Sequence, residues 1–106
     1  MKLSLWQWIR RRRRLKRVAH VDSMNDLPAH LGSSLFVIGH SNPKWVVLEC
    51  PCRCGRRIDV NLMRGRCPRW RISESTRGAT LAPSLWMPSN QCGSHFFVRE
   101  NRIIWV

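Results

Sequence analysis

Short runs of apolar residues alternate with turn residues along most of this chain, and the runs have the length of β-strands. Residues 34–40 and 44–50 are nearly continuous apolar runs separated by Ser-Asn-Pro, which predicts a β-hairpin. In residues 56–62 apolar and polar residues alternate, as they do in a strand with one buried face. The pattern therefore predicts three consecutive strands in the middle of the chain.

The C-terminal half continues with similar short runs. Residues 68–73 predict another strand, and residues 94–100 and 102–106 predict two strands joined around Asn101, a residue type that tolerates a positive φ. Residues 78–90 are expected to be a loop with a short extended piece. The last two strands are therefore predicted to form a second hairpin.

Six or seven short strands, with turns at intervals of about 8–12 residues, are typical of a mainly β protein. Residues 22–31 predict a turn or a one-turn helix, and no helix of ordinary length is predicted after residue 32. A chain of 106 residues fits one domain. We expect a small single-domain sheet or sandwich of about six short strands.

Charge divides the chain into two parts. The formal net charge is +13, and residues 1–17 hold eight of the Lys and Arg residues without any acid. We therefore predict a basic N-terminal arm over 1–19, helical or disordered, and a β domain over 20–106. The arm favours anionic partners, namely nucleic acid or an anionic surface, and its candidate nucleic-acid-binding residues are Arg11, Arg12, Arg13 and Arg14.

Targeting signals are not evident. No stretch approaches the ~20 apolar residues of a membrane span. The apolar residues 3–9 precede the arginine run, which reverses the order of a secretory signal. We therefore expect a cytoplasmic protein, where thiols stay reduced and clustered cysteines indicate metal or redox chemistry more than disulfides. Five cysteines are also an odd number, which pairing alone leaves incomplete.

The cysteines are arranged as two clusters with metal-ligand spacing. Cys50, Cys52 and Cys54 form C-x-C-x-C, and Cys92 and His95 form C-x-x-H. Two such pairs brought together by strand packing supply the four ligands of a tetrahedral structural zinc site. The predicted ligands of one structural Zn²⁺ are Cys52, Cys54, Cys92 and His95, with Cys50 in reserve. Such a Cys/His metal site would hold the short strands together, so residues 20–106 are predicted to be a zinc-binding β domain.

Other uses of the sulfur remain open. Arg53, Arg56 and Arg57 would lower the pKa of a neighbouring thiol, so redox-active cysteines are one alternative, and plain core thiols are another. A Rieske cluster of the usual two-histidine type is not supported, because Cys54 stands where its first histidine would be. Cys67 has no partner nearby in sequence, and such a cysteine is expected to be a small buried hydrophobe.

Catalytic patterns are weak. Ser94 and His95 adjoin in sequence, but adjacent residues on a strand point to opposite faces, so they do not form a nucleophile–base pair. Asp59 and Glu49 flank the cysteine turn and could polarise a metal-bound water if the site were open. We expect them instead to pair with neighbouring basic residues, namely Arg56, Arg57 or Lys44.

These motifs together resemble an uncharacterised family of small bacterial and phage proteins. Its pattern is C-x-C-G-C-G, then P-x-W, then L-x-P-S, then C-x-S-H-[FY]-[FW]-[IV], and finally a Trp. The similarity covers roughly residues 27–106, and Arg53 replaces a glycine of the pattern. The matching residues are Cys50, Cys52, Cys54, Gly55, Pro68, Trp70, Leu81, Pro83, Ser84, Cys92, Ser94, His95, Phe96, Phe97, Val98 and Trp105.

The resemblance implies a metal-binding domain, with zinc as the metal. Some members of that family are encoded beside bacterial ubiquitin-like conjugation systems that are linked to anti-phage defence. Such systems contain ubiquitin-like proteins, activating and conjugating enzymes and a JAB-type metallopeptidase. The resemblance therefore implies protein partners among the components of a ubiquitin-like pathway.

The function predicted on these grounds is that of a non-catalytic zinc-binding accessory or adaptor protein in such a modification or defence system. Two alternatives stay open. One is a nucleic-acid-binding protein that uses the Arg-rich arm. The other is a metal-dependent hydrolase or peptidase, which needs an open coordination position. The nucleic-acid alternative would also use the arginines of the β domain, namely Arg56, Arg57, Arg64, Arg66, Arg69 and Arg71.

Overall fold

Eight β-strands form two sheets in the computed structural model, which describes residues 5–106. The first sheet has the order β1-β2-β3-β4 and the second the order β5-β6-β7-β8. The predicted mainly β class is confirmed. The strands are β1 (Arg17–Val21), β2 (Ser34–Ile38), β3 (Trp45–Glu49), β4 (Arg57–Asn61), β5 (Arg71–Ser75), β6 (Gly78–Trp86), β7 (His95–Arg99) and β8 (Arg102–Trp105).

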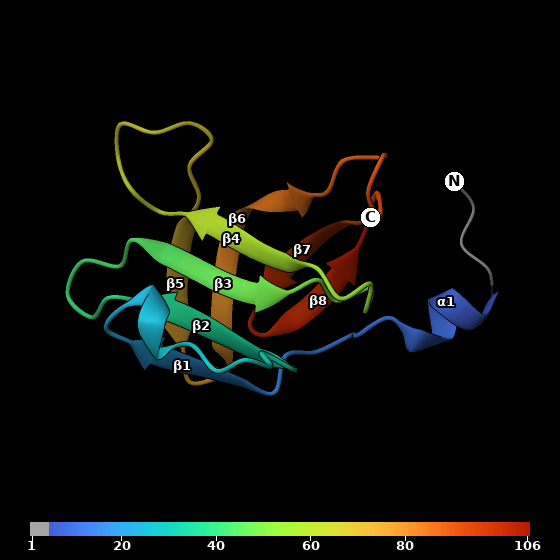
Figure 1. Ribbon diagram of the computed structural model, residues 1–106, viewed down its shortest axis with the longest axis horizontal. Coiled ribbons are helices and arrows are strands. Elements are labelled where there is room, and N and C mark those ends of the chain that lie inside the picture. Colours follow the sequence, from blue (N-terminus) through green and yellow to red (C-terminus); the bar gives the residue numbers. More distant parts are fainter. Residues whose placement is uncertain (1–4) are drawn as a thin grey trace.

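The two sheets pack face to face as a sandwich, and α1 (Leu5–Arg10) projects from one end (Figure 1). The main core lies between the sheets, where Leu48 and Val60 of the first sheet meet Leu85 and Phe96 of the second. Apolar residues at alternate positions of β4, β6 and β7 supply this core, as the period of a strand requires. The apolar patterning thus positions both sheets.

The first sheet is also covered on its other face. Phe36, Ile38 and Val47 form a second cluster, against which Met24 and Leu27 of the segment around the short 3-10 helix η1 (Met24–Asp26) pack. Burial on both faces explains why β2 and β3 are continuous apolar runs and not alternating ones. The antiparallel pairing of these two strands confirms the predicted hairpin.

The N-terminal segment joins the sandwich before residue 20. Strand β1 pairs with β2 in parallel, although its first three residues fall in the predicted basic arm. Leu15 is only 2% exposed and lies in the main core. The backbone N–H of Arg12 donates to the Pro51 carbonyl, and the Arg13 carbonyl accepts from Ile103. Residues 11–19 therefore pack against the sandwich.

Strand β6 replaces the predicted loop over residues 78–86. The prediction is corrected because tertiary pairing with β5 and β7 overrides the local effect of Gly78 and Pro83. Between Leu81 and Leu85 the register with β7 shifts. Leu81 pairs with Val98 and Leu85 pairs with Phe96, so β6 advances by four residues where β7 advances by two. Pro83 sits within this bulge, where a strand tolerates a residue that cannot donate a hydrogen bond.

Asn101 closes the β7–β8 hairpin and ties it to β6. Its φ is +64°, and its Oδ1 accepts a hydrogen bond of 2.8 Å from the buried Ala79 N–H. We expect Asn101→Ala to lower the free energy of unfolding by about 2–4 kcal/mol, because it removes a buried acceptor and strains the left-handed backbone. Urea unfolding measures this loss. Asn101→Gly removes only the side-chain bond and should be milder, whereas a loss below about 0.5 kcal/mol for both variants would contradict the assignment.

No helix within residues 5–106 has the length and apolar character required to cross a membrane.

Candidate active site and cysteine cluster

A serine and a histidine meet on the outer face of the second sheet. The Oγ of Ser84 lies 2.9 Å from the Nε2 of His95, within hydrogen-bond distance. Ser84 belongs to β6 and His95 begins the neighbouring strand β7. Both side chains are half-buried, so they are held in place and still reach solvent. The distance is that expected between a nucleophile and its general base.

The bulge in β6 determines how the pair meets. Leu81 and Leu85 on either side of it point into the core, which leaves Ser84 on the opposite face. The shifted register sets Trp86 directly across from His95 and leaves Ser84 in the diagonal position. Trp70 supports this arrangement, because its indole N–H donates a 3.2 Å hydrogen bond to the Ser84 carbonyl.

An exposed tryptophan covers the histidine. The rings of Trp86 and His95 are stacked, with centroids 4.4 Å apart and parallel planes. Phe97 lies two residues further along β7, and its ring centroid is 6.4 Å from that of His95. The outer face around Ser84 is thus partly aromatic.

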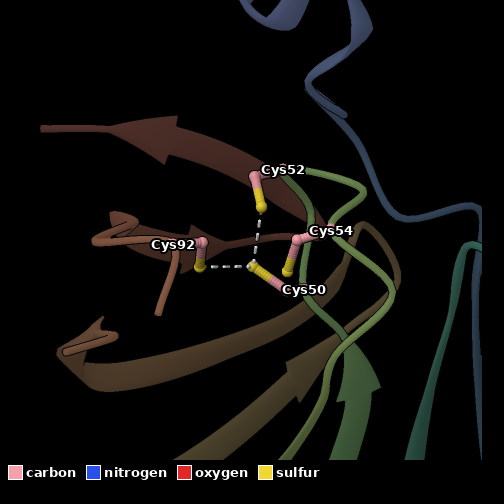
Figure 2. Close-up of side chains that lie close together, drawn as sticks. All are labelled: Cys50, Cys52, Cys54 and Cys92. Carbon is pink, nitrogen blue, oxygen red and sulfur yellow. Dashed lines mark hydrogen bonds between the residues drawn. The ribbon is translucent and has the colours of Figure 1, made fainter. Parts of the chain in front are cut away.

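Four cysteines gather beside one end of the sandwich (Figure 2). Cys50, Cys52 and Cys54 come from the turn between β3 and β4, and Cys92 comes from the loop between β6 and β7. Their sulfur atoms all lie within 4.8 Å of one another. The Cys50 sulfur is 3.4 Å from that of Cys52 and 3.7 Å from that of Cys92.

This spacing fits a tetrahedral metal site. A metal with sulfur ligands at about 2.3 Å would hold them about 3.8 Å apart, and four thiolates form a closed structural zinc site. The cluster of Cys50, Cys52, Cys54 and Cys92 is therefore consistent with a metal such as zinc. Such a site would link the β3–β4 turn of one sheet to the β6–β7 loop of the other.

The thiols of the cluster differ in acidity. Burial raises the pKa of Cys50, and burial also raises the pKa of Cys54. Burial acts in the same direction on Cys92, but hydrogen bonds with the side chain and backbone of Ser94 and with the thiols of Cys50 and Cys52 together outweigh it and lower the pKa of Cys92 to about 7. Of the thiols of Cys50, Cys54 and Cys92, the last is the one that most readily supplies a thiolate to a metal.

The predicted metal ligands fall into two places. Cys52, Cys54 and Cys92 lie in the cluster together with Cys50, the predicted reserve. His95 lies outside this group of four, and its ring contacts Ser84 and Trp86. The ligand set itself stays a prediction.

Ser94 and Cys67 also differ in environment. Ser94 is buried and hydrogen-bonds to Cys92, whereas the ring of His95 contacts Ser84. Cys67 is exposed, which corrects the expectation of a buried thiol. It stands in the loop between β4 and β5, where neighbouring residues are exposed as well.

The acids beside the cysteine turn are paired. Asp59 accepts two hydrogen bonds from Arg57, at 2.7 and 3.0 Å, as the sequence predicts. The Oε1 of Glu49 lies 3.8 Å from the Nη2 of Arg12. Arg12 belongs to the N-terminal segment and is not one of the expected partners.

The four arginines of the predicted nucleic-acid-binding set are not equivalent. The guanidinium of Arg11 lies 3.9 Å from the ring centroid of Trp105, and Arg12 is the partner of Glu49. Arg13 and Arg14 are exposed. Binding of nucleic acid by this segment stays a prediction.

Ser84 is the site residue that spacing arguments overlook. The L-x-P-S motif marked it as part of a pattern, but no histidine is close to it in sequence. Its partner, His95, is brought to it only by the pairing of β6 with β7 across a shifted register. The joint presence of L-x-P-S and S-H-[FY] was the available signal.

Fold and clusters define a small β-sandwich protein with a four-cysteine cluster of metal-site geometry. Residues 21–106 match the BubE family, which is described as the serine protease of bacterial ubiquitination-like systems, and the chain belongs to this family. The implied connection with a bacterial ubiquitin-like system is confirmed at this level. No curated protein and no solved structure matches the chain.

Proposed function

We propose that this protein is a serine protease of a bacterial ubiquitination-like system, with Ser84 as nucleophile and His95 as general base. The observation that carries the proposal is the 2.9 Å contact between Ser84 Oγ and His95 Nε2 on a solvent-facing strand pair. The family description supports it. A non-catalytic adaptor, the function predicted from the sequence, would make no use of the Ser84–His95 pair.

The chemistry follows from the two side chains. With the ring proton on Nδ1, Nε2 accepts the Ser84 hydroxyl proton while Oγ attacks the substrate carbonyl carbon. The tetrahedral intermediate then breaks its carbon–nitrogen bond as His95 returns that proton to the leaving amine. Water, deprotonated by the same histidine, hydrolyses the resulting acyl ester and restores Ser84.

The location of the pair suits a polypeptide substrate. Ser84 lies on the outer face of the second sheet, and its neighbours Ala82, Pro83 and Trp86 are exposed. A protein chain can therefore approach without threading into a cavity. We infer that the substrates are peptide bonds of proteins in the same ubiquitin-like system.

The metal has a structural role in this proposal. Cys50, Cys52, Cys54 and Cys92 would hold one Zn²⁺, and four thiolates leave no position for a water. When bound, the ion would link the β3–β4 turn to the loop that leads into His95. This differs from the metal-dependent hydrolase of the sequence analysis, in which the metal itself performs the reaction.

A burst experiment tests the proposal without knowledge of the natural substrate. Purified protein is mixed with p-nitrophenyl acetate, and nitrophenol release is followed from the first milliseconds. An acyl-enzyme that forms faster than it hydrolyses should give a burst close to one nitrophenol per protein molecule. Ser84→Ala should abolish the burst.

The matched control is Ser73→Ala. Ser73 is an exposed serine on β5 of the same sheet, opposite Thr80 of β6, and it should leave the burst unchanged. A burst that survives in Ser84→Ala would contradict the assignment of the nucleophile. A different result would favour the metal-dependent alternative. In that case hydrolysis would be steady from the start, without a burst, and a chelator would stop it while the protein stays folded.

A further inference from the structure

Within residues 5–106, no acidic side chain is paired with the candidate general base, His95. The chain contains six acidic residues, and all of them lie in the described part of the structure. Each has its own partner away from His95. The pairs are Asp22 with His40, Asp26 with Ser23, Glu49 with Arg12, Asp59 with Arg57, Glu74 with His20, and Glu100 with Arg77.

A catalytic histidine needs a third group. In a Ser-His-Asp triad the carboxylate holds the imidazole in orientation and stabilises the imidazolium that forms during the reaction. Without an orienting group, rotation about the outer side-chain bond of His95 would carry Nε2 away from Ser84 Oγ. If the pair is catalytic, another group must therefore orient the imidazole and stabilise the imidazolium.

Trp86 is placed to orient the imidazole and to stabilise the imidazolium. Its ring is parallel to the His95 ring at a centroid distance of 4.4 Å, and the strand register sets the two residues directly opposite each other. A parallel stack at this distance limits rotation of the imidazole. The face of an indole also attracts a cation, and it is the strongest of the aromatic side chains in this respect.

We propose that Trp86 is a positioning residue for His95 that replaces the acid of a Ser-His-Asp triad. This inference rests on the proposed serine protease function. Trp86 orients the imidazole so that Nε2 faces Ser84 Oγ, and its ring face stabilises the imidazolium while the proton is on Nε2. The outcome is a dyad supported by an aromatic ring.

The exposure of Trp86 supports a role outside folding. The side chain is 71% exposed, so it adds little to the core, and its ring stacks on His95. Replacement of so exposed a residue should leave the fold intact. The role of Trp86 can therefore be tested by substitution in a protein that stays folded.

The test measures reactivity of Ser84 with a fluorophosphonate probe. The rate of labelling at increasing probe concentration gives the maximal rate constant kinact and the half-saturation constant KI. We expect Trp86→Leu to lower kinact about 10- to 100-fold with KI nearly unchanged, because a misplaced base slows the reaction more than binding. Trp86→Phe keeps an aromatic face and should recover much of kinact.

Phe97→Leu is the matched control. Phe97 is aromatic and lies on the same sheet face, but its ring is 6.4 Å from His95 and inclined by 29°. We expect its kinact to remain within about twofold of the wild type, since it lacks the close parallel stack. Thermal unfolding of all three variants checks that the fold is kept.

The outcomes separate this inference from the function on which it rests. Wild-type protein that does not react with the probe at all overturns the serine protease proposal itself. Labelling of wild type together with an unchanged kinact in Trp86→Leu overturns only the role of Trp86. A raised KI with unchanged kinact would also overturn it, because Trp86 would then be a contact for the probe and not a support for His95.

Discussion

Ser84→Ala is expected to lower ester and peptide hydrolysis by about 10⁴-fold or more, since loss of the nucleophile removes the covalent route. His95→Ala should cause a loss of similar size, because the hydroxyl of Ser84 is a weak nucleophile unless a base accepts its proton. Steady-state hydrolysis of p-nitrophenyl acetate by the purified variants provides the measurement.

The double variant makes this prediction sharper. Residues that act as a unit show non-additive losses, so Ser84→Ala combined with His95→Ala should be no slower than either single variant. Both side chains are half-buried on the outer sheet face, and their removal should hardly change the melting temperature. Independent, additive losses from two properly folded variants would contradict a shared catalytic role.

Of the Ser84–His95 pair, the sequence identifies only His95 as a candidate site residue. His95 was singled out by C-x-x-H spacing, and that spacing does fit a metal ligand. In the structure the ring of His95 contacts Ser84, because β6 and β7 pair across a bulge that shifts the register. Neither the bulge nor the pairing is a local property of the sequence, and the two residues are eleven positions apart, so the sequence alone does not reveal their contact.

Loss of the cysteine cluster has the second large expected effect. We expect Cys50→Ser to lower the melting temperature by at least about 15 °C or to abolish cooperative unfolding. Structural zinc contributes about 10–16 kcal/mol of apparent binding free energy in finger peptides, which is comparable to the whole stability of a small domain. Chelator-treated wild type should behave in the same way. Tryptophan fluorescence measures the melting temperature, and a zinc assay measures the metal that is released.

Cys67→Ser is the matched control for this variant. Cys67 is exposed and stands outside the cluster of four, so its replacement should change neither zinc content nor melting temperature. The result that would refute a structural metal is Cys50→Ser protein that unfolds as wild type does. Purified wild-type protein that contains no metal and is indifferent to chelator would refute it equally.

Strands were predictable where burial leaves a local pattern. The apolar run of β2, buried on both faces, and the alternation in β4 both reflect how these strands pack. Strands β1 and β6 were not predictable in the same way. The basic residues before β1 suggest an arm, but Leu15 fills the core, and Pro83 in β6 is accommodated by a bulge.

The central claim is that Ser84 is an activated nucleophile, and covalent labelling tests it most directly. Purified protein is treated with a fluorophosphonate, its intact mass is measured, and the modified residue is located by peptide mapping. The account predicts one adduct per molecule on Ser84 and none on Ser73, Ser89 or Ser94. An adduct on another residue, or no adduct in protein that retains its fold and its metal, would contradict it.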